Sequence, residues 1–242
     1  GAALAISTLP VGWWPWALSW ADGLAADLGL CHRRGVTTTT HDLRRDHRDA
    51  WSLDPTVTLL NHGSYGACPT AVLEAQRVWR ERLERNPVGF FLRTYFPALA
   101  EARAALATFL GADPDDLAFV TNATSAVNTV LRSLDFAPGD EILVTDATYQ
   151  ACRNAADHVA RRTGARVVVA ELPFPCEDVD DLVTAIEAAI TPRTTLALLD
   201  HITSATAVVM PLARVVAAVQ ARGVDVLVDG AHAPGQVEVD LD

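Results

Sequence analysis

From residue 117 onward, short apolar runs alternate with longer stretches in which apolar residues recur at helical spacing. Short β-prone runs separated by helical patterns of about 10–15 residues are typical of α/β folds, in which helices cover both faces of a parallel sheet. The runs predict strands at residues 117–121, 141–145, 166–170, 194–199 and 224–228. Helices are predicted between them, at residues 126–134, 150–162, 178–190 and 211–222.

The preceding segment has a different pattern. Residues 56–60 form a short β-prone run, and residues 61–66 hold two glycines among small polar residues, which suits a tight loop that a ligand could approach. Pro69 stands where proline opens a helix, and the helical pattern continues to Asn86. A second helix is predicted from near Pro97 to Gly111.

Residues 1–50 fit poorly with the rest of the chain. Pro10 and Pro15 interrupt the apolar run, and no basic region precedes it, so the pattern favours neither a signal peptide nor a membrane span. Residues 31–50 are polar, and their three histidines at irregular spacing favour a solvated linker over a metal site. We therefore predict a poorly structured leader or linker at 1–50 and one partial domain at 51–242.

Composition narrows the possible functions. The chain has 242 residues, 50% of them hydrophobic, which suffices for one large core. A net charge of −11 argues against a nucleic-acid or anionic-membrane partner, because both require basic surfaces. The four cysteines form no CxxC pair, which favours reduced thiols in a cytoplasmic protein without a metal site. The sequence contains no lysine, so a mechanism that needs a lysine amine cannot be run by these residues.

Polar residues follow several of the predicted strands. Ligands of open α/β sheets lie beyond the carboxyl ends of the strands, and Asp229 and His232 follow the strand at 224–228. Ala123 and Thr124 stand where a strand turns into a helix, and free N–H groups at a helix start favour phosphate. Tyr149 follows another strand and could stack on a flat heterocycle. Taken singly, each has an ordinary structural interpretation as a helix cap, a loop residue or a residue at the edge of the core.

Together these residues supply the parts of one kind of site. A phosphate cradle, an aromatic plate and a carboxylate that faces a ring nitrogen are what pyridoxal 5′-phosphate requires, because the carboxylate keeps the pyridine nitrogen protonated and the ring acts as an electron sink. The sequence lacks both GxGxxG after a strand and GxxxxGK[ST], which argues against dinucleotide and P-loop sites.

Six stretches, which together make up roughly three quarters of the chain, carry a family resemblance: LLNHGSYGACP (59–69), VWRERLERNPVGFFLR (78–93), FLGADPDDLAFVTNATSAVNTVLRSL (109–134), PGDEILVTDATYQACRNA (138–155), TPRTTLALLDHITSATAVVMPL (191–212) and RGVDVLVDGAHAPGQVEVDLD (222–242). In these stretches the chain resembles the class V aminotransferase family of pyridoxal-phosphate enzymes, and most of all its isopenicillin N epimerase-like branch. The resemblance implies the large domain of fold type I, with a mainly parallel sheet and helices on both faces.

The resemblance also implies roles for individual residues around the cofactor. By it, Ala123 and Thr124 contact the phosphate, Tyr149 covers the ring, and Asp229 pairs with the pyridine nitrogen. Ser204 is implied near the phenolic oxygen, and His232, the one catalytic candidate, is implied near that oxygen or the internal aldimine. The substrate is expected to border an N-terminal loop that contains Asn61, His62 and Tyr65.

Two departures from the family pattern stand out. Ala207 occupies a position where relatives commonly have glycine, which would cost about 1 kcal/mol if the backbone there has positive φ. The family's Schiff-base lysine and its C-terminal domain lie beyond Asp242. We therefore expect a fragment without that lysine, inactive by itself, whose last strand leaves an unpaired sheet edge.

The resemblance implies an enzyme that acts at the Cα of a small amino-acid substrate, of epimerase or aminotransferase type, and a homodimer when full length. The alternatives are a cysteine desulfurase or C–S lyase on the same cofactor, or a non-catalytic truncated relic.

Overall fold

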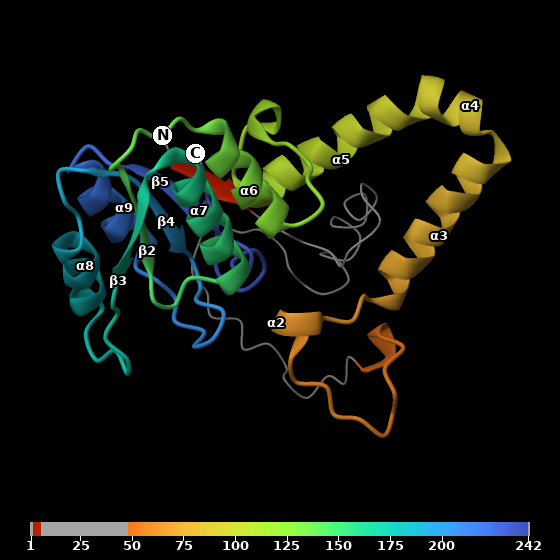
Figure 1. The fold of residues 1–242 in the computed structure, drawn as a ribbon. Coiled ribbons are helices and arrows are strands. Elements are labelled where there is room, and N and C mark those ends of the chain that lie inside the picture. Colours follow the sequence, from red (N-terminus) through yellow and green to blue (C-terminus); the bar gives the residue numbers. More distant parts are fainter. Residues whose placement is uncertain (1, 6–47, 242) are drawn as a thin grey trace. The chain divides into compact units, whose positions relative to one another are not determined.

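The computed structural model describes residues 2–5 and 48–241, which form two compact units (Figure 1). The first unit contains Val120–Val239 together with the N-terminal strand, and the second contains residues 48–119 with 240 and 241. Elements of the first unit are β1 (Ala2–Ala5), α6 (Ala123–Ser133), β2 (Glu141–Thr145), α7 (Gln150–Thr163), β3 (Arg166–Ala170), α8 (Val179–Ala188), β4 (Thr194–Asp200), α9 (Leu212–Gln220) and β5 (Asp225–Asp229).

The first unit is an α/β structure built on a five-stranded sheet. Its strands are all parallel and lie in the order β1-β5-β4-β2-β3. The predicted fold class is confirmed, since helices alternate with parallel strands along the chain. The strands predicted at 141–145 and 166–170 have the predicted bounds, and those predicted at 194–199 and 224–228 differ from β4 and β5 by one residue.

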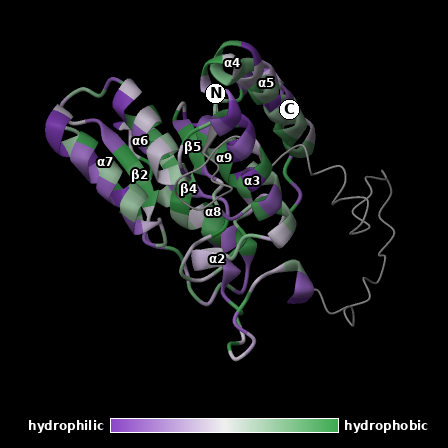
Figure 2. Ribbon diagram, turned by 90° about the vertical axis from the view of Figure 1, so that its right-hand side faces the viewer, coloured by the Kyte–Doolittle hydropathy of each residue, from purple (hydrophilic) through white to green (hydrophobic). Residues whose placement is uncertain are grey.

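Alternating side chains of the strands pack against helices on opposite faces. Ile142 and Leu198 point to the face covered by α6 and α7, where Val127 and Val159 complete a buried cluster. Leu143 and its neighbours on β4 and β5 point to the other face, against α8 and α9. Because both faces are covered, the strands are apolar along nearly their whole length, and Figure 2 shows β2, β4 and β5 in the colours of hydrophobic residues.

One predicted strand is not formed. Residues 117–121 make no strand among the described residues, although Leu117 has an extended backbone with φ −100° and ψ 132°. The prediction was wrong because a β-prone run becomes a strand only where a neighbouring strand accepts its hydrogen bonds. The β-prone run at 56–60 likewise forms no strand, and Thr56 lies in a turn where its amide donates to Asp54 at 2.8 Å.

The N-terminal region departs from the sequence prediction at two places. Strand β1 pairs in parallel with β5, so the sheet edge expected to be unpaired is occupied by residues of the predicted leader. Arg48–Ala50 forms a short 3-10 helix. Residues 6–47, with the three histidines of the predicted linker, lie outside the described residues, and the domain boundary at residue 51 stays a prediction.

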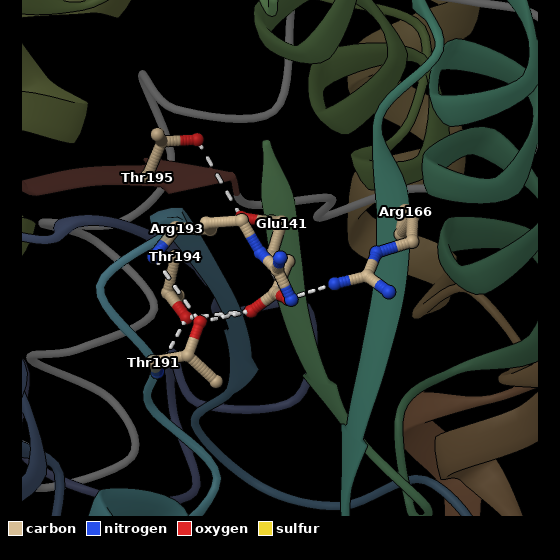
Figure 3. A network of polar contacts seen from close by, with 6 residues as sticks. All are labelled: Glu141, Arg166, Thr191, Arg193, Thr194 and Thr195. Carbon is tan, nitrogen blue, oxygen red and sulfur yellow. Dashed lines mark hydrogen bonds and ion pairs between the residues drawn. The ribbon is translucent and has the colours of Figure 1, made fainter. Parts of the chain in front are cut away.

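A buried carboxylate ties the amino ends of three strands together (Figure 3). Glu141 begins β2, its side chain is 2% exposed, and it is the register partner of Arg166 on β3 and Thr194 on β4. It accepts hydrogen bonds from Arg166 at 2.5 Å, from Thr191 at 2.5 Å and from Arg193 at 3.1 Å. This network lies at the end of the strands opposite to Asp200 and Asp229, so it supports the sheet without taking part in the candidate site.

The second unit is helical. Its elements are α2 (His62–Tyr65), α3 (Thr70–Arg85), α4 (Pro87–Gly89), the π-helical segment η3 (Phe90–Thr94), α5 (Tyr95–Leu110) and η4 (Pro114–Asp116). The helix predicted to end at Asn86 is confirmed, and the helix predicted from near Pro97 begins two residues earlier. The predicted loop at 61–66 instead contains one helical turn, capped by the Asn61 side chain, which accepts from the Ser64 amide at 3.2 Å.

Candidate active site

Two acidic residues meet at the carboxyl end of the sheet. Asp200 ends β4, Asp229 ends β5, and the two are register partners on neighbouring parallel strands. Residues two apart on a strand share a face, so both side chains follow Leu198 and Leu227 to the face covered by α6 and α7. Only 6% of Asp200 and 5% of Asp229 is exposed, which places two carboxyl groups in a nearly dry environment.

The carboxylate of Asp229 has hydrogen-bond donors on both oxygens. Oδ1 accepts from the amide of Ala231 at 3.1 Å, and Oδ2 accepts from the Cys152 thiol at 3.1 Å. Cys152 lies fully buried in the first turn of α7. Burial, and after it the charge of Asp229, raises the pKa of the Cys152 thiol, so the sulfur keeps its proton and remains a donor. Both oxygens of Asp229 are thus held by hydrogen bonds from its surroundings.

Asp200 is satisfied on one oxygen only. Oδ1 accepts from the amide of Tyr149 at 3.4 Å, whereas Oδ2 is buried and has no hydrogen-bond partner among the described residues. Burial, and after it the nearby charge of Asp229, raises the pKa of Asp200 to about 7. The pair is therefore asymmetric, because both oxygens of Asp229 have a donor and one oxygen of Asp200 has none.

The start of α6 lies beside this acidic pair. Asn122 caps the helix, because its side chain accepts from the Ser125 amide at 2.8 Å. Ala123 is buried, and the side chain of Thr124 interacts with the Cys152 thiol. The first amides of a helix lack carbonyl partners within it and carry partial positive charge, so this end can hold an anion a short way from Asp229.

An exposed aromatic ring borders the same place. Tyr149 immediately precedes α7, and 45% of it is exposed although its amide is held by Asp200. A ring fixed through its backbone and open on its surface can stack on a planar ligand. The stacking role of Tyr149 stays a prediction.

Two loops complete the carboxyl end of the sheet. His232 is half-buried in the turn three residues after Asp229, and Ser204 is exposed in the turn that follows β4. The second turn is closed by Thr203, whose side chain accepts from the Val208 amide at 2.9 Å. Within it Ala207 has φ +54°, which confirms the positive φ considered at this position. Six predicted cofactor residues thus lie at one end of one sheet, and their individual roles stay predictions.

The predicted substrate residues belong to the other unit. Asn61 caps α2, the ring of His62 lies 5.8 Å from that of Trp51, and the side chain of Tyr65 is exposed. Their role in binding substrate stays a prediction.

Within residues 2–5 and 48–241, no three or more histidine, cysteine, aspartate or glutamate side chains gather as a metal site would require. In the same described part of the chain, every helix is too short or too polar to cross a membrane.

Comparisons with known proteins agree with this geometry. A family model, described as aminotransferase class-V, matches residues 84–242. The chain belongs to the class-V aminotransferase family. Isopenicillin N epimerases of Amycolatopsis lactamdurans and Streptomyces clavuligerus are 43% and 40% identical to it, over 80% and 78% of the chain. A putative L-cysteine desulfhydrase of Oryza sativa subsp. japonica is 37% identical over 78% of the chain.

Solved structures of the same kind of enzyme share the fold. The cystine C–S lyase C-DES, in a variant with glycine covalently linked to its PLP cofactor, matches with a TM-score of 0.65 and 29% identity over 72% of this chain and 47% of that one. The cysteine desulfurase CsdA from Escherichia coli matches with a TM-score of 0.59 and 29% identity over 72% of this chain and 45% of its own. The predicted family and cofactor class are therefore confirmed at the level of the family.

The class-V relatives are longer proteins. The two epimerases are covered over 49% and 48% of their length, and the desulfhydrase over 43%, so the chain spans about half the length of the curated relatives it matches. Epimerases and a putative desulfhydrase both occur among these relatives, and membership of the family does not by itself choose between the two activities.

Asp200 and Cys152 were missed as site residues by the sequence analysis. The signal for Asp200 was present, because it follows an apolar strand as Asp229 does. Cys152 had no comparable signal, since a cysteine in the first turn of a helix is usually a core residue.

Proposed function

We propose that this chain is the cofactor-binding half of a pyridoxal 5′-phosphate enzyme that acts at the Cα of an amino acid and is of isopenicillin N epimerase type. The observation that carries the proposal is the convergence at one sheet end of a buried, thiol-supported carboxylate, a helix start and an exposed aromatic ring. The two epimerases, at 43% and 40% identity, support this branch.

The residues present fit the cofactor. A pyridinium nitrogen brings one positive charge, and Asp229 is a buried carboxylate with a second, half-satisfied acid at its side. A phosphate group brings negative charge, and the amides of Ala123 and Thr124 at the start of α6 can donate hydrogen bonds to its oxygens. When bound, the cofactor would supply an electron sink that makes the Cα proton of an amino acid acidic.

Each residue then has a distinct task. Asp229 would hold the proton on the ring nitrogen, and Cys152 would keep Asp229 oriented through its hydrogen bond at 3.1 Å. Tyr149 would cover one face of the ring and keep water from it. Because the sequence contains no lysine, we propose that these 242 residues bind the cofactor without a covalent link and are inactive by themselves.

Equilibrium dialysis of pyridoxal 5′-phosphate against the 242-residue chain tests cofactor binding. Because a charge-assisted hydrogen bond would be lost, we expect the D229N variant to weaken binding by about tenfold or more. D225N is the matched control, because Asp225 begins the same strand at the end remote from the site and is exposed. Equal affinities for wild type and D229N would overturn the proposed site, and borohydride treatment is expected to attach no cofactor to any side chain.

A second candidate activity is cleavage of a C–S bond, which the desulfhydrase relative and the C-DES structures favour. An experiment with methylamine, which replaces the missing lysine amine, distinguishes the epimerase-type activity from C–S bond cleavage. We expect deuterium exchange at the Cα of isopenicillin N to exceed that with free cofactor. Sulfide release from L-cysteine without such exchange would favour the C–S lyase, and neither reaction in the cofactor-loaded chain would favour a non-catalytic protein.

We also propose that the full-length protein is a homodimer that takes a small amino-acid substrate and resides in the cytoplasm. A group of exposed apolar side chains on the second unit supports self-association, namely Val88, Phe91, Leu92 and Phe96. Light scattering coupled to size-exclusion chromatography would decide the stoichiometry, and a monomer at micromolar concentration would contradict the dimer.

A further inference from the structure

Among the described residues, Asp200 is the one buried carboxyl group at the carboxyl end of the sheet that the proposed function leaves without a task. It is more than nine-tenths buried, and its Oδ2 has no hydrogen-bond partner among the described residues. A buried oxygen without a donor is costly when ionised, because no water or N–H group replaces its lost hydration. The geometry therefore favours a proton on Oδ2 while the site is empty.

The neighbour of Asp200 strengthens this preference. Asp229 is its register partner on β5, so the two carboxyl groups leave adjacent strands in the same direction. Asp229 is the better holder of a negative charge, since the Ala231 amide and the Cys152 thiol both donate to it. Other groups around the pair are the Tyr149 amide, which donates to Asp200 Oδ1, the Thr148 hydroxyl near Asp200 and the Thr124 hydroxyl beside Cys152, none of which carries a charge.

We propose that Asp200 is a positioning residue that holds a proton while the site is empty and releases it to solvent when a protonated pyridine nitrogen lies against Asp229. The O–H bond of Asp200 breaks, its electron pair stays on Oδ2, and the new negative charge offsets the incoming cation. This inference rests on the proposed function, because it takes pyridoxal 5′-phosphate as the ligand.

The direction in which cofactor affinity changes with pH follows from the ionisation of Asp200 beside Asp229. The pKa of Asp200 is raised to about 7 by burial and by the charge of Asp229, and an approaching cation lowers it again. Binding at a pH below about 7 then releases a proton, and linkage requires affinity to rise with pH by up to about tenfold per pH unit in that range. Above about pH 8, Asp200 is already ionised and this dependence ends.

The first measurement uses the ligand-free protein. In the wild type with ¹³C-labelled aspartate, we expect one carboxyl resonance to titrate near neutral pH and to vanish in D200N. In D229N the same resonance should titrate at lower pH, because the neighbouring charge is gone. If no aspartate titrates above pH 5, Asp200 holds no proton and the proposal is overturned.

The second measurement counts protons on binding. Pyridoxal 5′-phosphate is titrated calorimetrically in two buffers of different ionisation enthalpy, and the D200N result is subtracted so that protons from the cofactor itself cancel. We expect a difference of up to one proton at pH 6 and none at pH 8.5, with a flatter rise of affinity with pH in D200N. Equal proton counts in wild type and D200N at pH 6 would overturn the coupling.

The two measurements separate this inference from the function on which it rests. If the wild type shows the neutral titration but binds no cofactor, the proposed function fails together with the coupling, and the protonated Asp200 remains. If the cofactor binds through Asp229 without proton release, the function stands and the role of Asp200 is rejected. Thermal unfolding of D200N with a single cooperative transition is the check that the variant is folded.

Discussion

The carboxylate of Glu141 is expected to be the largest single polar contribution to the stability of the sheet. We consider E141A, which removes the carboxylate, and E141Q, which keeps its size but replaces one acceptor oxygen by an amide donor. In either variant the Thr191 and Thr194 hydroxyls, at 2.5 Å and 3.3 Å from Glu141 Oε2, lose a charged acceptor inside the sheet.

The loss of stability on replacing Glu141 is limited by the solvent exposure of its two arginine partners. Removing one member of a buried ion pair costs about 3–5 kcal/mol when the remaining charge stays buried. Here the side chains of Arg166 and Arg193 are 55% and 61% exposed, so their charges can be hydrated after the change. We therefore expect a loss of about 3 kcal/mol for E141A and about 2 kcal/mol for E141Q. At about 2–4 °C per kcal/mol, the E141A midpoint should fall by roughly 6–12 °C.

The pH dependence supplies a second criterion. The Thr191 hydrogen bond lowers the pKa of Glu141 most, burial opposes it, and the hydrogen bonds from Arg193 and Arg166 lower it further. A carboxyl whose folded-state pKa is lowered stabilises the protein above its unfolded pKa, and this stabilisation is lost as pH falls through the folded value. The difference between wild type and E141Q should therefore be complete near pH 7 and shrink below about pH 4.

Calorimetric unfolding of the three proteins between pH 3 and pH 7 measures both quantities. The matched control is E187Q, because Glu187 pairs with Arg222 at 3.6 Å in a partly exposed ion pair whose loss should cost about 0–1 kcal/mol. If E141Q unfolds within 2 °C of E187Q at pH 7, or if its deficit persists unchanged at pH 3, the strands are not held by this carboxylate.

Three further predictions concern the candidate site and its loops. A207G should raise the free energy of unfolding by about 1 kcal/mol in chemical denaturation, since glycine adopts the observed φ of +54° without strain, and no gain would contradict this. Cys152 should resist alkylation of the native protein while Cys68 and Cys176 react, because burial raises its pKa and removes access, and mass mapping of the adducts decides this. The raised folded-state pKa of Asp200 favours folding at low pH, and this contribution is lost as pH rises from about 4 to about 7. The free energy of unfolding of D200N should therefore exceed that of the wild type by up to about 4 kcal/mol at pH 8 and by little at pH 4. A difference in stability that does not change with pH would refute the assignment.

Periodicity predicted the interior of the sheet because that part of the fold is dictated by burial. The runs EILVT and RVVVA are apolar along their length and bounded by turn residues, so their limits as strands follow from the sequence. Residues 117–121 have the same local character but form no strand, since strand formation depends on a partner that no local pattern specifies. The pairing of β1 with β5 was likewise beyond local reasoning, because it joins distant residues.

The candidate site was predictable as far as it follows from topology. Parallel strands place their carboxyl ends together, which is why Tyr149, Ser204 and Asp229 come to one end of the sheet. The ionisation of Asp200 was not predictable in this way, since it arises from the contrast between its unpartnered Oδ2 and the two donors on Asp229. Such asymmetry depends on side-chain geometry within one or two ångströms.

The pairing of β1 with β5 determines the order in which the sheet can be completed. Ala2 is translated long before its partner Val226, and β2, β3 and β4 lie between β1 and β5 in the sequence, although β1 and β5 are neighbours in the sheet. Closing so long a segment costs chain entropy, and contacts distant in sequence form slowly. Strand β1 can therefore pair only after β5 has been made, and until then the hydrogen-bonding edge of β5 is open to chaperones or to another nascent chain.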